Sequence, residues 1–446
     1  MNKPATGGGA EMQISRRMLF AYALPAAPLA ALGLPLYSLV PTYYTETLGL
    51  PIASVGWAVL IVRLFDAVTD PLAGYAADRI NPGFGRRRLL FLLSLPIAAL
   101  SALMLYWPAD GAGVAWLTVW GMLTSLGFTL AVVPYSAWGA ELVSDYNGRT
   151  RLTSTREGLT LVGTLIAIVL PFAIGFEQKG FSGLAVLGIA VAAMLLLFGS
   201  LTVWLVPEPV DTTKRRLPLL QSLSFLVANR PFLRLIAAFF LNGLANGIPA
   251  TLFLYFVSAR LLLPELRGPL LFLYFLSAIV GVPLAALAAR KLGKHRAWSV
   301  AMIAACAIFS MAPFLSSGAA IPFALICSAT GLLLGFDLAL PPSIQADVID
   351  ADTAASGDQR SGLYFAAWGL ATKLSLAAGV GIVFPLLGYF GFNPFPDAHN
   401  DETALFALAA IYAWVPVALK LAAIALMWNF PLDKTAQNEL QARIRQ

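Results

Sequence analysis

The sequence predicts an all-α membrane protein with twelve transmembrane helices, arranged as two pseudo-symmetric bundles of six helices each. Apolar residues make up 59% of the 446 residues and charged residues only 12%, whereas a soluble globular chain usually carries about 25% charged residues. Apolar runs long enough to cross a bilayer recur along the chain, and a pattern from the first half returns in the second. A soluble multi-domain enzyme is therefore not expected.

The spans follow from the apolar runs. A spanning helix needs about 20 mostly apolar residues, and runs of this kind cover residues 19–44, 52–77, 89–107, 114–141, 159–176, 184–206, 232–257, 269–289, 298–314, 321–346, 363–390 and 404–428. Arg16 and Arg17 before the first run resemble a twin-arginine export signal, but the run is longer than the roughly 7 to 15 apolar residues of a signal peptide. We expect these arginines to hold the N-terminus inside the cell.

The distribution of basic residues predicts the orientation and the domain boundaries. Most of the 29 Lys and Arg residues fall in segments on the same side of the membrane as the N-terminus, and cytoplasmic loops carry such an excess. Both termini are therefore expected in the cytoplasm, with the chain in the cell (inner) membrane. The predicted parts are a cytoplasmic tail (1–17), a six-helix bundle (18–206), a cytoplasmic linker (207–230), a second bundle (231–430) and a cytoplasmic tail (431–446).

The net charge of +6 does not indicate a nucleic-acid partner, because the basic residues are spread over short loops and do not form one basic face. The two cysteines, Cys306 and Cys327, both lie in apolar runs. Two cysteines provide neither a disulfide framework nor a cysteine-based metal site.

An internal repeat relates the two halves. Residues 127–131 and 335–339 share the pattern Gly-Phe-x-Leu-Ala, and the tripeptide Pro-Leu-Ala at 71–73 returns at 283–285. A parallel repeat of six spans places a substrate site between the halves, near the middle of the bilayer. We expect a monomer, because the chain supplies its own pseudo-symmetric pair, and a small-molecule substrate.

Three acidic residues lie inside predicted spans: Asp66, Asp70 and Asp337. A charged side chain at the centre of a span costs roughly 2.5 to 3.5 kcal/mol, so such residues are functional candidates. Arg63, Asp66 and Asp70 share one face of the second span. Two carboxylates one turn apart repel each other unless a cation or a proton joins them, which predicts a site for a coupling ion, Na⁺ or H⁺. A salt bridge between Arg63 and Asp66 is the structural alternative, but it leaves Asp70 unexplained.

Arg63, Asp337 and further basic and aromatic residues inside the spans are candidates for the substrate cavity. Lys373 must find an acid or a polar cavity, whereas Arg156 lies near a helix start and either lines the cavity or extends to the membrane surface. We interpret Lys420 either as a side chain that extends to the membrane surface or as an unexplained charge. Tyr135 and Trp368 offer rings that stack on a substrate, although aromatic residues in spans more often serve packing.

The loop after the second span combines glycines, an acid and arginines. Gly74 is followed by Asp78 and Arg79, and then by Gly85 and Arg87. Glycine lets helices approach closely, and arginines interact favourably with helix C-termini. Simple anchoring on the cytoplasmic side explains the arginines alone, but the glycine–acid–arginine spacing is more specific. These five residues form one loop pattern.

These residues resemble the major facilitator superfamily, and within it the family of glycoside-pentoside-hexuronide:cation symporters. The segments that carry the resemblance are 63–71, 133–141, 145–156, 346–350 and 362–373. The resemblance implies that the loop pattern serves as a gating latch. It also implies that Asp66 and Asp70 are the carboxylates of the cation site and hold Na⁺ if the ion is sodium. Thr129 would add an oxygen to this site, and Arg156 and Lys373 would be polar residues of the central cavity.

The chain also departs from the family's sugar carriers. They hold acids where this chain has Ala30 in the first span and Val132 in the fourth, and tryptophans where it has Ser136 and Leu338. Asp337 is a hypothetical replacement for the missing acid, which would favour proton coupling or a different substrate.

The predicted function is the cation-coupled symport of a small organic solute, with a glycoside or another sugar as the first expectation. A carrier of lysophospholipids or other amphiphiles is the alternative. A sensor that no longer transports and a channel are further alternative functions for a membrane-spanning chain. An intramembrane prenyltransferase is a distant alternative, because the spacing of Asp66, Asp70 and Asp78 does not match its aspartate motif. No enzymatic activity and no cofactor besides the coupling ion are expected.

Overall fold

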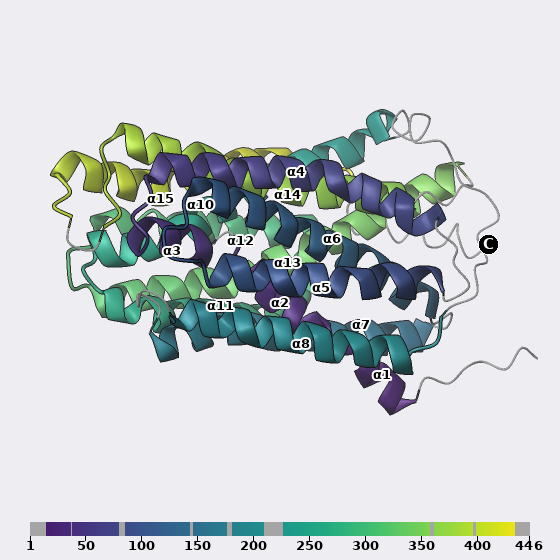
Figure 1. Cartoon of the computed structure of the whole chain (residues 1–446). Coiled ribbons are helices and arrows are strands. Elements are labelled where there is room, and N and C mark those ends of the chain that lie inside the picture. The colour runs from purple at the N-terminus through teal and green to yellow at the C-terminus, as the bar shows by residue number, and fades with distance from the viewer. Residues whose placement is uncertain are drawn as a thin grey trace, which may run out of the picture.

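The structure, a computed structural model, describes residues 15–36, 38–79, 85–142, 146–175, 181–208, 226–356, 361–395 and 398–432. Within these ranges the regular structure is helical, and the long helices run side by side along one axis (Figure 1). One end of the bundle carries α1 (Arg16–Ala23) and the C-terminus of α8 (Gly183–Leu205), and we call it the terminal end. The opposite end carries α3 (Leu39–Glu46) and is the far end.

The long helices correspond to the predicted spans from the second onwards. In the N-terminal half they are α4 (Ile52–Arg79), α5 (Arg86–Tyr106), α6 (Val114–Leu142), α7 (Tyr146–Ile174) and α8. In the C-terminal half they are α10 (Arg230–Tyr255), α11 (Arg267–Leu292), α12 (Lys294–Phe309), α13 (Ala320–Ser356), α14 (Ser361–Tyr389) and α15 (Glu402–Met427). A π-helical turn (Phe256–Arg260) and two 3₁₀ turns (Pro264–Leu266 and Ala312–Phe314) lie between them.

The first predicted span is broken, which corrects the expectation of one helix over 19–44. It consists of α1, α2 (Ala26–Gly33) and α3. Pro25 lies directly before α2, and Pro35 lies between α2 and α3. Proline lacks the backbone N–H that an uninterrupted helix requires. Among the described residues, eleven helices are long and apolar enough to cross a membrane, so the all-helical membrane fold is confirmed but twelve continuous helices are not.

Several helices extend beyond the apolar runs that predicted them. The predicted fifth span begins at residue 159, whereas α7 begins at Tyr146, and α13 continues past residue 346 to Ser356. Hydropathy detects only the part of a helix that suits the bilayer, while backbone hydrogen bonding continues into polar sequence. The predicted domain boundaries stay predictions, since most of the linker, residues 209–225, lies outside the described residues.

The two halves contact each other from the middle of the bundle to the far end. Helix α4 packs against α14, and α7 packs against α11. At the far end, Arg267 of α11 forms an ion pair with Glu46 of α3, with Nη1 2.8 Å from Oε2 and both side chains only 3% exposed. The hydroxyls of Thr45 and Tyr255 lie 2.6 Å apart beside this pair. These buried contacts hold the far ends of the two halves together.

Glycines allow the closest helix crossings. A Cβ atom on Gly281 of α11 would lie 1.9 Å from the carbonyl oxygen of Leu332, and one on Gly335 of α13 would lie 2.4 Å from the carbonyl carbon of Gly281. Gly127, the counterpart of Gly335 in the repeated pattern, would meet the backbone nitrogen of Ala98 at 2.7 Å. The repeated glycine therefore serves a close helix crossing in both halves.

The variant Gly281→Ala is expected to destabilise the protein by about 1 to 3 kcal/mol, because the added methyl group forces α11 and α13 apart. Thermal unfolding of the purified protein measures this loss. Gly369→Ala on α14 is the matched control, since its Cβ would meet nothing within 4 Å and alanine favours the helix. Equal melting temperatures for the two variants would contradict this account of the crossing.

Candidate functional site

Two carboxylates of α4 and a hydroxyl of α6 form the centre of the candidate site. Asp66 is 1% exposed, whereas the side chain of Asp70, one helical turn further on, is 26% exposed. The Oγ1 atom of Thr129 lies 2.7 Å from Asp70 Oδ1 and 3.1 Å from Asp66 Oδ1. A hydroxyl has one proton and donates it to one of these oxygens at a time. The predicted trio of cation-site residues is therefore together in space.

Lys373 reaches this centre from the other half of the chain. It lies on α14, and its Nζ atom is 3.1 Å from Asp66 Oδ2 and also forms an ion pair with Asp70 Oδ2. The same atom lies 3.5 Å from Thr129 Oγ1. The ammonium group thus lies among the oxygens that were predicted to hold a coupling cation. Its charge relieves the repulsion between the two carboxylates.

Arg63 adds a second positive charge to that of Lys373. It lies on the same face of α4 as Asp66 and Asp70. Its Nη1 atom lies 3.7 Å from Asp66 Oδ2, and the residue is 8% exposed. The Arg63–Asp66 salt bridge considered from the sequence is therefore present. It does not account for the whole cluster, because Asp70 pairs with Lys373.

The donor set suits a small monovalent cation or a proton. Carboxylate and hydroxyl oxygens are hard ligands that bind hard cations, and two neighbouring carboxylates also share a proton readily. Within the described parts of the chain, there is no group of three or more His, Cys, Asp and Glu residues placed to hold a metal ion. By their chemistry, the oxygens of Asp66, Asp70 and Thr129 suit a coupling ion.

Asp337 lies in a separate polar cluster of the C-terminal half. Its carboxylate accepts hydrogen bonds from Trp298 Nε1 at 2.6 Å and from Asn246 Nδ2 at 2.9 Å, and pairs with Lys420 Nζ at 3.1 Å. Lys420 also donates to Asn242 Oδ1 at 2.5 Å. Lys420 therefore does not extend to the membrane surface, as one reading of the sequence had it, but neutralises Asp337.

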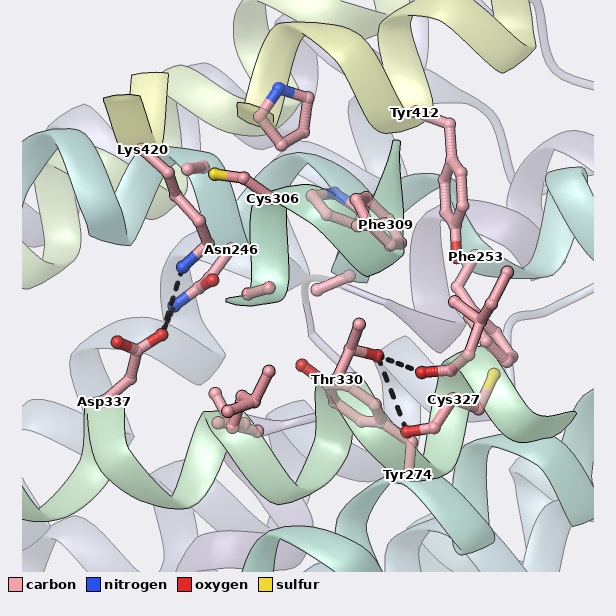
Figure 2. A pocket seen from close by; sticks show the side chains of 18 of the residues that line it. Asn246, Phe253, Tyr274, Cys306, Phe309, Cys327, Thr330, Asp337, Tyr412 and Lys420 are labelled. Atoms are coloured by element: carbon pink, nitrogen blue, oxygen red, sulfur yellow. Dashed lines mark hydrogen bonds and ion pairs between the residues drawn. The ribbon is translucent and has the colours of Figure 1, made fainter. Parts of the chain in front are cut away.

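This cluster forms the polar side of a cavity that is partly open to solvent. Figure 2 shows Asp337, Lys420 and Asn246 on one side and aromatic side chains such as Tyr412 and Phe253 on the other. The cavity is lined by α10, α11, α12, α13 and α15, with residues of the broken first span at one side. Both cysteines line it as free thiols. Sequence reasoning missed the Asp337–Lys420 pair, although two opposite charges inside spans were a usable signal.

Two aromatic candidates take part in packing. The ring of Tyr135 stacks on Tyr22 with centroids 4.7 Å apart, and each hydroxyl donates to the other residue's carbonyl oxygen. The ring of Trp368 stacks on the ring of Phe239, with centroids 3.7 Å apart.

The third candidate, Arg156, forms an ion pair with its neighbour Glu157, with Nη2 2.7 Å from Oε1. The roles of Tyr135, Trp368 and Arg156 toward a substrate stay predictions.

Part of the predicted gate packs within the N-terminal half. Gly85 has a φ of +112° and lies against Glu208, which follows α8. The carboxylate of Glu208 accepts hydrogen bonds from the backbone N–H groups of Arg87 at 2.8 Å and Arg88 at 3.2 Å. It thereby caps the positive N-terminus of α5.

The backbone of Gly74, Asp78 and Arg79 belongs to α4. Their surroundings lie outside the described residues, so the gating role stays a prediction.

Membrane-type helices with a cluster of ionisable side chains between the two halves of the chain are typical of membrane transporters. The family model described as MFS/sugar transport protein matches residues 19–434. The chain belongs to this family, and the predicted resemblance to the sugar symporters of the major facilitator superfamily is confirmed.

Known proteins similar to this chain are named as transporters. The inner membrane symporter YicJ of Escherichia coli (strain K12) is 26% identical over 84% of this chain and 82% of its own length. The isoprimeverose transporter of Lactiplantibacillus pentosus is 25% identical over 89% of this chain and 86% of its own length. The glucuronide carrier protein homolog of Escherichia coli (strain K12) is 24% identical over 90% of each chain.

A solved structure supports the fold. It is a bacterial homologue of the human lysosomal transporter Spinster, in an inward-facing and unoccupied conformation. It superimposes with a TM-score of 0.69 at 14% identity, covering 97% of this chain and 99% of that chain.

The variant Asp337→Asn is expected to lower stability by about 3 to 5 kcal/mol, because it leaves the Lys420 ammonium without its carboxylate. Thermal unfolding measures the loss, and adding Lys420→Met should recover much of it by removing the unpaired charge. Uptake per folded molecule should keep its dependence on a cation, since Asp66 and Asp70 are unchanged. Loss of that dependence would place Asp337 in the coupling site instead.

Proposed function

We propose that this protein is a cation-coupled symporter of a sugar or glycoside that works by alternating access. One observation carries the proposal: the Lys373 ammonium of the C-terminal half is bound by Asp66 and Asp70 of the N-terminal half. A site of this kind, built from both halves, changes whenever the halves move relative to each other. Membership of the sugar transport family agrees with it.

Competition between Lys373 and the coupling ion supplies the coupling step. An ammonium 3.1 Å from Asp66 Oδ2 and paired with Asp70 fills the space that a coordinated Na⁺ would need. Protonation of either carboxylate would equally weaken its hold on Lys373. Binding of the ion therefore displaces Lys373 and changes the contact between α4 and α14, so that the ion biases the equilibrium between two arrangements of the halves.

The far-end contacts indicate which face is closed. The Glu46–Arg267 pair and the Thr45–Tyr255 contact join the halves at that end, and they must separate before it opens. With the terminal end in the cytoplasm of the cell, the described conformation faces inward. We assign Gly74, Asp78, Arg79, Gly85 and Arg87 to the gate at the terminal end, in a monomer of the inner membrane.

The other functions considered receive less support. The family model is described as a sugar transport protein, and two of the relatives are named as an isoprimeverose transporter and a glucuronide carrier homolog, which favours a sugar over a lysophospholipid. A prenyltransferase would use an aspartate cluster for a divalent metal, whereas Asp66 and Asp70 are paired with Arg63 and Lys373.

The variant Asp66→Asn is expected to abolish cation-driven accumulation while the protein remains folded, because Asp70 still pairs with Lys373. Uptake of labelled methyl glucuronide and methyl glucoside into proteoliposomes, driven by a Na⁺ or a pH gradient, measures this. Asp110→Asn is the control, since Asp110 is an exposed loop carboxylate. A variant at Asp66 that still concentrates either sugar would refute the proposed coupling.

A further inference from the structure

The cavity of the C-terminal half is separate from the candidate cation site. Its lining residues belong to α10, α11, α12, α13 and α15 and to the first span, and none of those described lies on α4, α6 or α14. Those three helices carry the carboxylates, the hydroxyl and the ammonium of the cation site. A ligand in the cavity therefore has surroundings of its own and need not touch the coupling residues.

One end of the cavity combines balanced charge with unused hydrogen-bonding groups. Of its three N–H donors, Lys420 uses two, toward Asp337 Oδ2 and Asn242 Oδ1. Among the described residues, its third N–H and the amide oxygen of Asn246 have no hydrogen-bond partner. Lys420 and Asn246 both contact Asp337 Oδ2, so this donor and this acceptor are neighbours. Such a pair fits a hydroxyl group, which both donates and accepts.

The charges at this end exclude a charged occupant. Asp337 and Lys420 already neutralise each other, so the charge of an ionic ligand would be buried without a counter-charge, which is costly. The polar end therefore selects a neutral group.

A tyrosine hydroxyl points into the cavity away from this polar end. Tyr412 extends into the cavity from α15 (Figure 2) and is 2% exposed. Its hydroxyl has no hydrogen-bond partner within the part of the chain that the structure describes, and a buried hydroxyl without a partner is unfavourable. Tyr412 and Lys420 lie about 12 Å apart along the axis of α15, at about 1.5 Å per residue. A ligand that reaches both side chains is therefore elongated.

The rest of the cavity wall is largely apolar and rich in aromatic rings. Phe253, Phe309 and Phe323 line it together with aliphatic side chains such as Leu334. Aromatic rings pack favourably against such a wall. An apolar lining with a few placed polar groups is the usual composition of a small-molecule site.

We infer that this cavity is a second binding site, for a neutral, elongated aromatic compound with a hydroxyl group at each end. One hydroxyl bonds to the Lys420 ammonium and the Asn246 oxygen, and the other bonds to the Tyr412 hydroxyl. The aromatic rings between them pack against the phenylalanine side chains. The site goes beyond the proposed symport and does not depend on it, because the coupling residues lie on other helices.

Biphenol, which has two joined rings with a hydroxyl in each para position, is the probe, and para-phenylphenol, which lacks one hydroxyl, is its matched control. Equilibrium dialysis with the purified full chain in nanodiscs, against empty nanodiscs as the baseline, measures both affinities. The additional hydrogen bond should make biphenol bind about 2- to 10-fold more tightly. Equal affinities, or no binding of biphenol above the baseline, would overturn the inference.

The variant Tyr412→Phe tests the hydroxyl that has no partner. It should remove the preference for biphenol over para-phenylphenol while leaving the binding of para-phenylphenol nearly unchanged, because only the second hydroxyl of biphenol loses its contact. Tyr389→Phe is the matched control, since Tyr389 is 85% exposed at the end of α14, and it should keep the full preference. A preference that persists in Tyr412→Phe would overturn the assignment of this residue to the site.

The two cysteines of the chain report where the probe binds. Cys306 and Cys327 both line the cavity as free thiols. Saturating biphenol should slow their alkylation by N-ethylmaleimide, as measured by mass spectrometry of the peptides. Binding that leaves both alkylation rates unchanged would place biphenol elsewhere and refute the site.

The variant Asp66→Asn separates this inference from the proposed function. Protection of the thiols by biphenol should be the same in this variant as in the unchanged protein, even where cation-driven accumulation is lost, because Asp66 lies outside the cavity. Loss of the protection in Asp66→Asn would show that the cavity is part of the coupling site and would overturn its independence.

Discussion

The structure depends most on the contact between Lys373 and the carboxylates of Asp66 and Asp70. It joins α14 to α4 and so links the two halves of the chain at the middle of the bundle. It also neutralises two carboxylates that would otherwise repel each other within one helical turn. Because the contact is ionic and lies among oxygens that suit a cation, a small ion can replace it. In the proposed cycle, one interaction therefore serves both cohesion and coupling.

Other contacts between and within the halves determine which parts can move when an ion replaces Lys373. The buried Glu46–Arg267 pair closes the far end, and breaking such a pair leaves uncompensated charge unless both partners regain water. Close helix crossings at Gly281 and Gly335 keep α11 and α13 together. In the proposed cycle the halves move at their interface, where the ionic contacts of Lys373 with Asp66 and Asp70 can be exchanged.

The surroundings of the two ionic clusters suit them to different roles. The Asp66–Asp70 cluster combines residues of both halves, so its geometry changes when the halves move. The Asp337–Lys420 pair lies within the C-terminal half, where Trp298 and Asn246 satisfy the remaining oxygens. A carboxylate with three donors, one of them its counter-charge Lys420, is well suited to shape a cavity and poorly suited to exchange its partner.

Local sequence determined the spans from the second onwards and the face shared by Arg63, Asp66 and Asp70, because apolar run length and i,i+4 spacing are properties of neighbouring residues. Thr129 entered the predicted site only through the family resemblance. Tertiary structure decided which ionic partners meet, since Lys373 and Lys420 lie far along the chain from Asp66 and Asp337. It also decided the break of the first span, because hydropathy does not register how prolines divide a helix. Contacts between helices depend on packing in three dimensions, which a one-dimensional pattern does not contain.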